Sequence, residues 1–153
     1  MLDIGSGIGG PARYIASKTK AKIYAVEISE DFRKDLFSRF NSAKITIIGN
    51  DAANLASIVP DKSIDKAILI NVIYFLDPLD TYLKELKRIL KTSGVIIIAG
   101  KFGLAQGFDP KIFKNTDIQK IMPALEKHFA VTSTYVDLGD ESSRYHAIKL
   151  TRK

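Results

Sequence analysis

The stretch MLDIGSGIGG, residues 1–10, places a cluster of glycines directly behind a short apolar run. Glycines at such a junction let the backbone turn sharply and let a ligand approach it closely, while the following helix N-terminus offers free N–H groups. Gly5, Gly7 and Gly9 give the pattern GxGxG, whereas Gly5, Gly7 and Gly10 give the GxGxxG of dinucleotide-binding folds. The spacing alone leaves both patterns open.

Three acidic residues near this loop bear on its ligand: Asp3 and Asp51 favour an adenosine-bearing cation over a dinucleotide, and Glu27 fits either ligand. Asp3 lies two positions before the first glycine, where a carboxylate would repel phosphate and attract an ammonium or sulfonium group. Glu27 ends the next apolar run, where a carboxylate can accept hydrogen bonds from ribose hydroxyls, and Asp51 follows the third, where it could meet an adenine amino group. We expect all three at the crevice edge of one open sheet.

Strand-like and helical segments alternate over most of the chain, which predicts an α/β fold with a doubly wound, mostly parallel sheet. Strands are expected over residues 2–4, 22–28, 44–49, 65–71 and 95–100, with Ser93 and Gly94 turning the chain into the last. Helices are expected over 10–18 and over 52–57. A third should follow the N-cap Ser29, with Phe32, Leu36 and Phe40 on one face. A fourth should follow Asp77 and Pro78, with an apolar stripe of Leu79, Leu83, Leu86 and Leu90.

In the last third of the chain, the regular alternation of strand-like and helical segments ends. Residues 101–116 read as a long loop. The part from Gly100 to Lys114, with Phe102, Phe108 and Phe113, could wall a substrate pocket or simply pack onto the sheet. Thr116 and Gln119 resemble a capping box for a helix with Ile118, Ile121, Met122, Leu125 and Phe129 on one face, kinked or broken at Pro123. The runs 130–138 and 143–150, joined by a GDES turn, predict a C-terminal antiparallel hairpin.

Composition narrows the functional classes. The 153 residues suit a single domain over 1–153, and the apolar fraction of 46% is that of a globular protein. With no cysteine and only two histidines, we expect neither a disulfide framework nor a metal site. No apolar run is long enough to span a membrane and no signal peptide is recognised, so a cytoplasmic protein is expected. The net charge of +6 is spread along the chain, so nucleic acid is not the expected partner.

Several motifs together resemble the class I S-adenosylmethionine-dependent methyltransferases, in particular their small-molecule branch. LDIGSGIGG is similar to the first motif of that family, AVEIS to its ribose-binding strand end, and GNDAANL to its adenine-contacting segment. DKAILINVIYFL resembles the fourth-strand motif, and LKRILKTSGVIIIAG the helix and strand that follow it. The resemblance covers residues 1–100, and the terminal hairpin is similar to the reversed last strand of the family's seven-stranded sheet.

The resemblance implies S-adenosylmethionine as cofactor, S-adenosylhomocysteine as product, and a role for each matching residue. The glycine loop would pack against the methionine part of the cofactor, with Asp3 near the methionine amino group and Asn71 offering an oxygen to that same end. Glu27 would hold the ribose. Ile28, Asp51 and Ala52 would contact the adenine. The loop residues in question are Gly5, Ser6, Gly7 and Gly9. Asp51 as a mere helix N-cap and Asn71 as a strand terminator are the alternatives.

The family's reaction is an in-line displacement by an O, N or C nucleophile of the acceptor, so a catalytic base is optional. Tyr74 stands where small-molecule members often carry a histidine; a tyrosine is a poor base at neutral pH but could orient an acceptor by a hydrogen bond, or simply cover the sheet edge. His128 and His146 are expected to be structural. The motif of amino-methylating nucleic-acid enzymes is absent because the corresponding positions read NVIY, residues 71–74.

The family normally carries helices before the first strand, and this sequence is expected to be an N-terminally truncated domain without that cap. A small-molecule methyl acceptor is the expected substrate. The alternatives are a non-catalytic cofactor-binding module or partner subunit and, through the GxGxxG pattern, a nicotinamide-dependent oxidoreductase. An exposed apolar edge or crevice would also favour self-association into a homo-oligomer.

Overall fold

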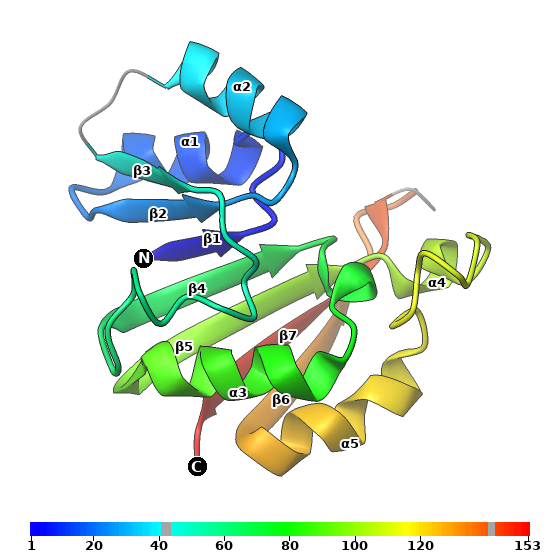
Figure 1. The fold of residues 1–153 in the computed structure, drawn as a ribbon. Coiled ribbons are helices and arrows are strands. Elements are labelled where there is room, and N and C mark those ends of the chain that lie inside the picture. The colour runs from blue at the N-terminus through cyan, green and yellow to red at the C-terminus, as the bar shows by residue number, and fades with distance from the viewer. Residues whose placement is uncertain (41–43, 141–142) are drawn as a thin grey trace.

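The computed structural model describes residues 1–40, 44–140 and 143–153. Its centre is a seven-stranded sheet in the order β3-β2-β1-β4-β5-β7-β6 (Figure 1). The strands are β1 (Leu2–Ile4), β2 (Ile23–Val26), β3 (Ile45–Ile48), β4 (Ile64–Ile70), β5 (Leu90–Gly100), β6 (Phe129–Val136) and β7 (Tyr145–Arg152). β1 to β5 pair in parallel, while β7 is antiparallel to both β5 and β6. The predicted doubly wound sheet with a C-terminal hairpin is confirmed.

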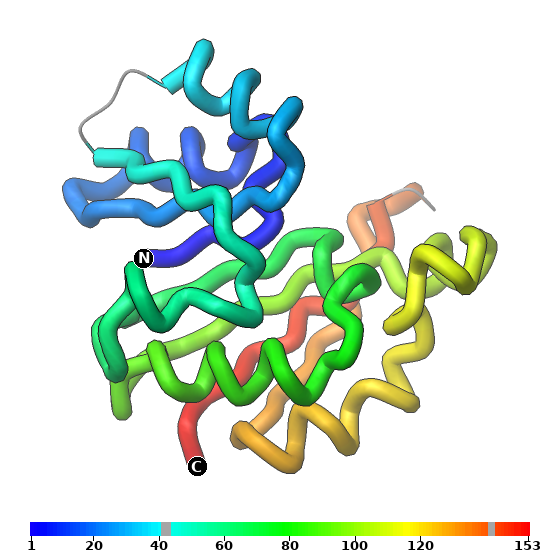
Figure 2. Tube along the Cα trace, in the orientation of Figure 1, coloured from blue at the N-terminus to red at the C-terminus, as the bar shows by residue number. Residues whose placement is uncertain are grey.

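The helices cover the two ends of the sheet differently. They are α1 (Gly10–Lys18), α2 (Glu30–Arg39), the 3-10 turn η1 (Ile73–Phe75), α3 (Leu79–Ile89), α4 (Phe102–Ala105) and α5 (Ile118–His128). α1 and α2 lie by β1 to β3, whereas α3 and α5 lie side by side along the other half (Figure 1). Figure 2 shows the C-terminal strand, in red, passing between β5 and β6.

The core lies mainly between α3, α5 and one face of the sheet. Alternate residues of the central strands are fully buried there, because successive side chains of a strand point to opposite faces. They pack against Leu83, Leu86 and Leu125 of the two helices. The buried strand residues are Ala67, Leu69, Ile96, Ile98, Ile148 and Leu150.

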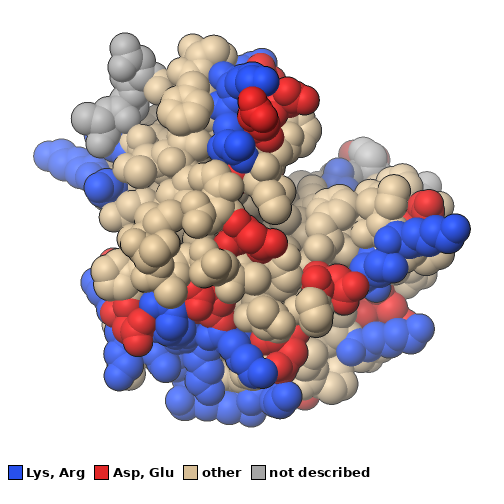
Figure 3. Space-filling model, in the orientation of Figure 1, with Lys and Arg blue, Asp and Glu red and all other residues tan. Residues whose placement is uncertain are grey.

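The surface is uneven in charge. In the view of Figure 3, lysines and arginines gather mostly along the lower edge, and acidic side chains lie beside the hollow between α2 and α4. None of the helices in the described part of the chain has the length and apolar composition needed to cross a membrane.

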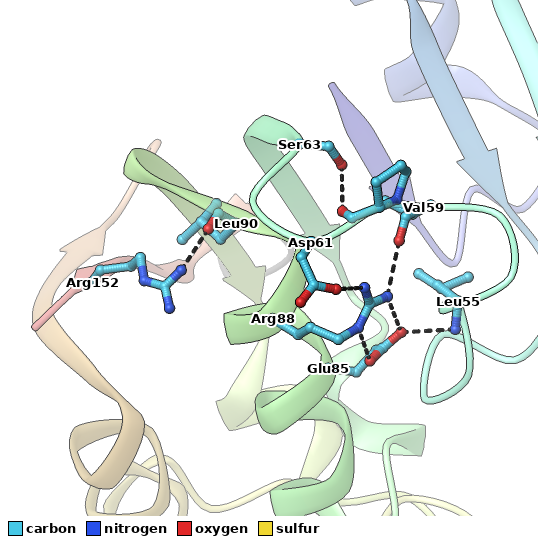
Figure 4. A network of polar contacts seen from close by, with 9 residues as sticks. Leu55, Val59, Asp61, Ser63, Glu85, Arg88, Leu90 and Arg152 are labelled. Atoms are coloured by element: carbon cyan, nitrogen blue, oxygen red, sulfur yellow. Dashed lines mark hydrogen bonds and ion pairs between the residues drawn. The ribbon is translucent and has the colours of Figure 1, made fainter.

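The helix predicted over residues 52–57 is wrong. Only isolated turns form there, and the segment crosses to α3 instead of coiling. Glu85 of α3 accepts the backbone N–H of Leu55 at 2.9 Å, and Arg88 donates to the carbonyl of Val59 at 3.0 Å (Figure 4). Side chains of α3 therefore satisfy backbone groups that helical hydrogen bonds would otherwise use.

The predicted turn at Ser93 and Gly94, between a helix and the strand 95–100, is wrong. β5 already begins at Leu90, which was assigned to the helical stripe. Ile64 pairs with Leu90 and Lys66 with Val95, so residues 91–94 bulge out of the ladder opposite a single residue of β4. The glycine marks this bulge rather than a turn between elements.

Three further expectations need correction in the last third of the chain. The predicted long loop contains the short helix α4. The N-cap of α5 is Asp117, whose side chain accepts the N–H of Gln119, and not Thr116. Pro123 lies inside one continuous helix, so of the two predicted alternatives, a kink or a break, the break is wrong. The predicted GDES turn includes residues 141 and 142, which lie outside the described residues.

Candidate functional site

The loop after β1 takes the GxGxG form. Gly5, Gly7 and Gly9 have φ values of +66°, +52° and +82°, a region that side chains other than glycine rarely adopt, whereas Gly10 begins α1. A Cβ on Gly5 would lie 2.3 Å from Val72 Cγ2, so the loop also packs too closely there for any larger residue. The geometry thus distinguishes the two patterns that the spacing left open.

Glu27, directly after β2, ties the glycine loop to the next helix. It is only 6% exposed, and its two carboxylate oxygens accept the N–H groups of Gly7 and Ser29, both at 2.8 Å. Arg33 of α2 donates to the carbonyl oxygens of Glu27 and Ile28 at 3.0 and 2.6 Å, fixing the strand end. Each carboxylate oxygen keeps one lone pair for a ligand hydroxyl. The sequence placed Glu27 at this edge but did not predict these bonds.

Asp51 follows β3 and is held on both sides. Its Oδ1 accepts the N–H of Ala53 at 2.8 Å, and its Oδ2 accepts the hydroxyl of Tyr82 at 3.2 Å. Burial, followed by the nearby Asp51 carboxylate, raises the pKa of Tyr82, which keeps this hydroxyl a donor. Tyr82 was missed by sequence reasoning because it comes from α3, across the fold. The available signal was the spacing of three residues from Tyr82 to Glu85 and again from Glu85 to Arg88.

These side chains surround a pocket of about 360 Å³ at the carboxyl ends of β1, β2 and β4. That volume lies within the range of small-molecule sites. No lysine, arginine or histidine is among its lining residues in the described part of the chain, so its charged groups are the Glu27 and Asp51 carboxylates. The predicted residues that line it are Gly5, Gly7, Glu27, Ile28, Asp51, Ala52 and Asn71. Asp3, Ser6 and Gly9 do not line it.

Asp3 lies in the middle of β1, on the side of the sheet that faces α1. It is 1% exposed, and its Oδ2 has no hydrogen-bond partner among the described residues. Burial raises the pKa of the Asp3 carboxyl to about 7, against smaller opposing effects of Ser6 and Ala12. β1 therefore holds, outside the pocket lining, an enclosed acid whose charge changes near neutral pH.

The wall of the pocket beyond β4 is apolar and partly exposed. Asn71, at φ +55°, directly follows β4 and donates its N–H to the carbonyl of Ala99 near the end of β5. Phe75 is 46% exposed and touches the ring of Phe113, which in turn contacts Phe108, both with centroids 4.8 Å apart. A row of aromatic rings thus leads from the pocket into the loop after α4.

Asn115 holds this loop against η1. Its Nδ2 donates to the carbonyls of Ile73 and Leu76 at 2.9 and 2.8 Å, and the N–H of Lys114 donates to the carbonyl of Tyr74 at 2.8 Å. Sequence reasoning did not single out Asn115. The loop and the pocket wall are therefore one hydrogen-bonded unit.

Tyr74 is buried and does not line the pocket. Its ring packs on Phe102 with centroids 5.5 Å apart, and its hydroxyl has no hydrogen-bond partner among the described residues. Burial raises its pKa to about 12, so the hydroxyl stays protonated and cannot act as a base near neutral pH.

The two histidines lie away from the pocket lining. His128 pairs with Asp80 at 2.7 Å, and His146 packs between the rings of Phe102 and Tyr135. Within residues 1–40, 44–140 and 143–153, no group of three or more acidic, histidine or cysteine side chains is arranged to hold a metal ion.

Comparison with known families gives a match over most of the chain. The sequence model described as "Methyltransferase domain" matches residues 2–98. Sterol 24-C-methyltransferase ERG6B of Gibberella zeae is 27% identical over 124 residues, covering 78% of this chain and 30% of that protein. Cyclopropane-fatty-acyl-phospholipid synthase of Escherichia coli K12 is 28% identical over 142 residues, covering 86% and 36%. The chain thus spans about a third of the length of these curated relatives.

A solved structure shares the fold. The protein complexed with the Haloferax volcanii Trm112 methyltransferase activator has a TM-score of 0.81 at 12% identity, covering 99% of this chain and 82% of that one. At this identity the likeness concerns the arrangement of the strands and helices alone.

Proposed function

Because the chain belongs to the methyltransferase family whose model matches residues 2–98, we propose that its pocket binds S-adenosylmethionine for methyl transfer to a small molecule. The observation that carries this proposal is the charge of the pocket. Two carboxylates line it without a cation from the lining residues, and a left-handed glycine loop forms its floor. Such a site suits a positively charged nucleoside and would repel the pyrophosphate of a nicotinamide cofactor.

The residues fit the cofactor part by part. The free lone pairs of Glu27 would accept the ribose hydroxyls, and those of Asp51 the adenine amino group. Ile28 and Ala52 would flank the adenine, while the glycine loop and Asn71 would face the methionine part. Since Asp3 does not line the pocket, we propose that it attracts the amino group through space rather than by contact.

The donor supplies, when bound, a methyl group on a positively charged sulfur, and S-adenosylhomocysteine is the product. The protein has then to align the acceptor atom and to exclude water. The Tyr74 hydroxyl stays protonated and does not line the pocket, so we assign it no contact with the acceptor. Neither His128 nor His146 lines the pocket. We therefore propose an acceptor atom that needs no strong base to remove a proton before the methyl group arrives.

The mouth of the pocket supports an apolar acceptor. Phe32, Phe75 and Phe108 are each about half exposed around it and along the adjoining loop. Exposed aromatic side chains that continue one another are typical of ligand sites. The names of the two curated relatives, which concern a sterol and a fatty-acyl phospholipid, support the same class.

Calorimetric titration tests the cofactor. We expect binding of S-adenosylmethionine and S-adenosylhomocysteine but not of NAD. Glu27→Ala should weaken binding by about 1.5–3 kcal/mol, the scale of hydrogen bonds to a charged group. Glu30→Ala, on the exposed side of α2, is the matched control and should bind as the wild type does. Tight NAD binding without S-adenosylhomocysteine binding would overturn the proposal.

Transfer itself needs a second measurement. Incubation with a labelled methyl donor and a lipid extract should yield labelled product if the chain is catalytic. Cofactor binding without transfer to lipid or to polar small-molecule acceptors would instead favour the alternative of a cofactor-binding module or partner subunit.

A further inference from the structure

One face of α3 holds the segment that carries Asp51. Tyr82, Glu85 and Arg88 follow one another at a spacing of three, so they lie along the same side of the helix. Tyr82 donates to Asp51 Oδ2, Glu85 accepts from Leu55, and Arg88 bonds to Val59, as Figure 4 shows for the last two pairs. Among the three, Tyr82 alone also lines the pocket.

The contact of Tyr82 determines how the Asp51 carboxylate is presented. With Ala53 N–H on Oδ1 and the Tyr82 hydroxyl on Oδ2, rotation of the carboxylate would break two hydrogen bonds. Each oxygen retains one lone pair, and both are acceptors only. A ligand group placed against this carboxylate must therefore donate a hydrogen atom, or leave a polar group without a partner.

We propose that Tyr82 is a positioning residue that fixes Asp51 and thereby makes the pocket selective for a purine with a 6-amino group. This inference rests on the proposed binding of an adenosine cofactor. The 6-amino group of adenine is a donor, whereas a purine with hydrogen at that position cannot donate there. A site built for a hydrogen bond rejects an analogue that lacks it more strongly than an apolar pocket rejects a missing methylene.

The test compares two ligands on four proteins. The ligands are S-adenosylhomocysteine and its analogue in which hydrogen replaces the 6-amino group, and calorimetry gives a dissociation constant for each. The proteins are the wild type, Tyr82→Phe, Asp51→Ala and the double variant. Tyr14→Phe removes a hydroxyl from an exposed tyrosine of α1 and is the matched control.

We expect the wild type and Tyr14→Phe to bind the 6-amino ligand about tenfold more tightly than the analogue, the factor for one hydrogen bond to a charged group. In Tyr82→Phe this ratio should fall toward one, mainly through weaker binding of the 6-amino ligand. In Asp51→Ala the ratio should be near one, and adding Tyr82→Phe should not change it further, because Tyr82 acts through Asp51.

Other outcomes separate the two proposals. A wild type that binds neither ligand would overturn the proposed function itself. An unchanged ratio in Tyr82→Phe, with wild-type binding intact, would overturn only the role of Tyr82. A loss of affinity for both ligands in Tyr82→Phe that persists in the Asp51→Ala background would mean direct contact with the ligand, and would overturn positioning through Asp51. Equal thermal unfolding of all variants confirms that the ratios compare folded proteins.

Discussion

The Asp3 carboxyl links the stability of the protein to pH. Its pKa is raised from 3.8 to about 7 because burial disfavours the charged form. Between these two values the folded chain binds a proton that the unfolded chain has released. The free energy of unfolding therefore falls as pH rises through this window, and the contribution is fully present only below about pH 4.

Replacing Asp3 by asparagine should remove this dependence. Urea unfolding of the wild type should show a decrease in stability from pH 5 to pH 8, and Asp3→Asn should show a flatter profile. From pH 5 to pH 8 the stability of the wild type is expected to fall by about 2–3 kcal/mol more than that of Asp3→Asn. Parallel profiles for both proteins would contradict the raised pKa.

The individual site residues differ in how far the sequence could predict them. Glu27 and Asp51 were predictable because each ends a strand, and the ends of parallel strands meet at one edge. Tyr82 was not, because its partner lies 31 residues earlier and the contact depends on a segment that crosses to α3. The two backbone bonds of Glu27 likewise follow from the curvature of the loop, which spacing does not specify.

At the scale of elements, α3 serves two faces with one sequence. Its leucines enter the core, as their period predicted, while Glu85 and Arg88 hold the crossing segment. Glu85 accepts hydrogen bonds from both Leu55 and Arg88. The hydrogen bonds from Arg88 hold the pKa of the Glu85 carboxyl below its usual range. Arg88 also reaches Asp61. The helix thus supports the segment that carries part of the pocket.

Glu85→Ala should destabilise the fold by about 2 kcal/mol, because a partly buried N–H and a guanidinium group both lose a partner. Lys84→Ala is the control, since it removes only an exposed ion pair with Asp80 and should cost well under about 1 kcal/mol. Thermal or urea unfolding of the three proteins measures both values. Equal losses of stability for Glu85→Ala and Lys84→Ala would show that the hydrogen bonds of Glu85 to Leu55 and Arg88 contribute no more than an exposed ion pair does.

The elements that periodicity predicted are those whose stability comes from a buried face. β1 and α1 are confirmed with the predicted ends, and α2 and the other four parallel strands are confirmed with shifted ends. The helix predicted over 52–57 is wrong because side chains of another element bind the backbone of this segment, and no local sequence pattern indicates such contacts. The turn predicted at residues 93–94 is wrong because turns and bulges favour the same residue types.

At the scale of the whole molecule, half of the sheet has a partly exposed apolar face. Ile68 and Ile97 pair with one another in the ladder and lie on the face opposite the buried Leu69 and Ile98. Both remain accessible to solvent, and Ile70 beside them is 39% exposed. Apolar side chains continue here across neighbouring strands, a pattern associated with association.

We therefore expect the chain to self-associate as its concentration rises. Light scattering should give a mass that increases with concentration, and Ile97→Lys should shift it toward the monomer by placing a charge on the face. Phe37→Lys, at an exposed position of α2, is the control and should leave the association unchanged. A constant monomer mass for the wild type would contradict the expectation.

The doubly wound, mostly parallel class of the sheet was predictable because alternating strands and helices of this length allow few topologies. The hairpin direction followed from the short connection between its two runs. What the sequence could not supply is the way in which distant segments meet above the sheet. The aromatic row from Phe75 to Phe108 depends on Asn115, which lies 42 residues from Ile73 in the chain.

The contacts of α3 with the crossing segment also bear on the order in which the molecule forms. They join groups 29 to 31 residues apart, whereas the glycine loop and Glu27 are 20 residues apart. The two sides of the pocket are therefore closed by separate contacts, and the adenine side is complete only when α3 has met the crossing segment. In a refolding experiment, the recovery of S-adenosylhomocysteine binding would then report the docking of α3 on that segment.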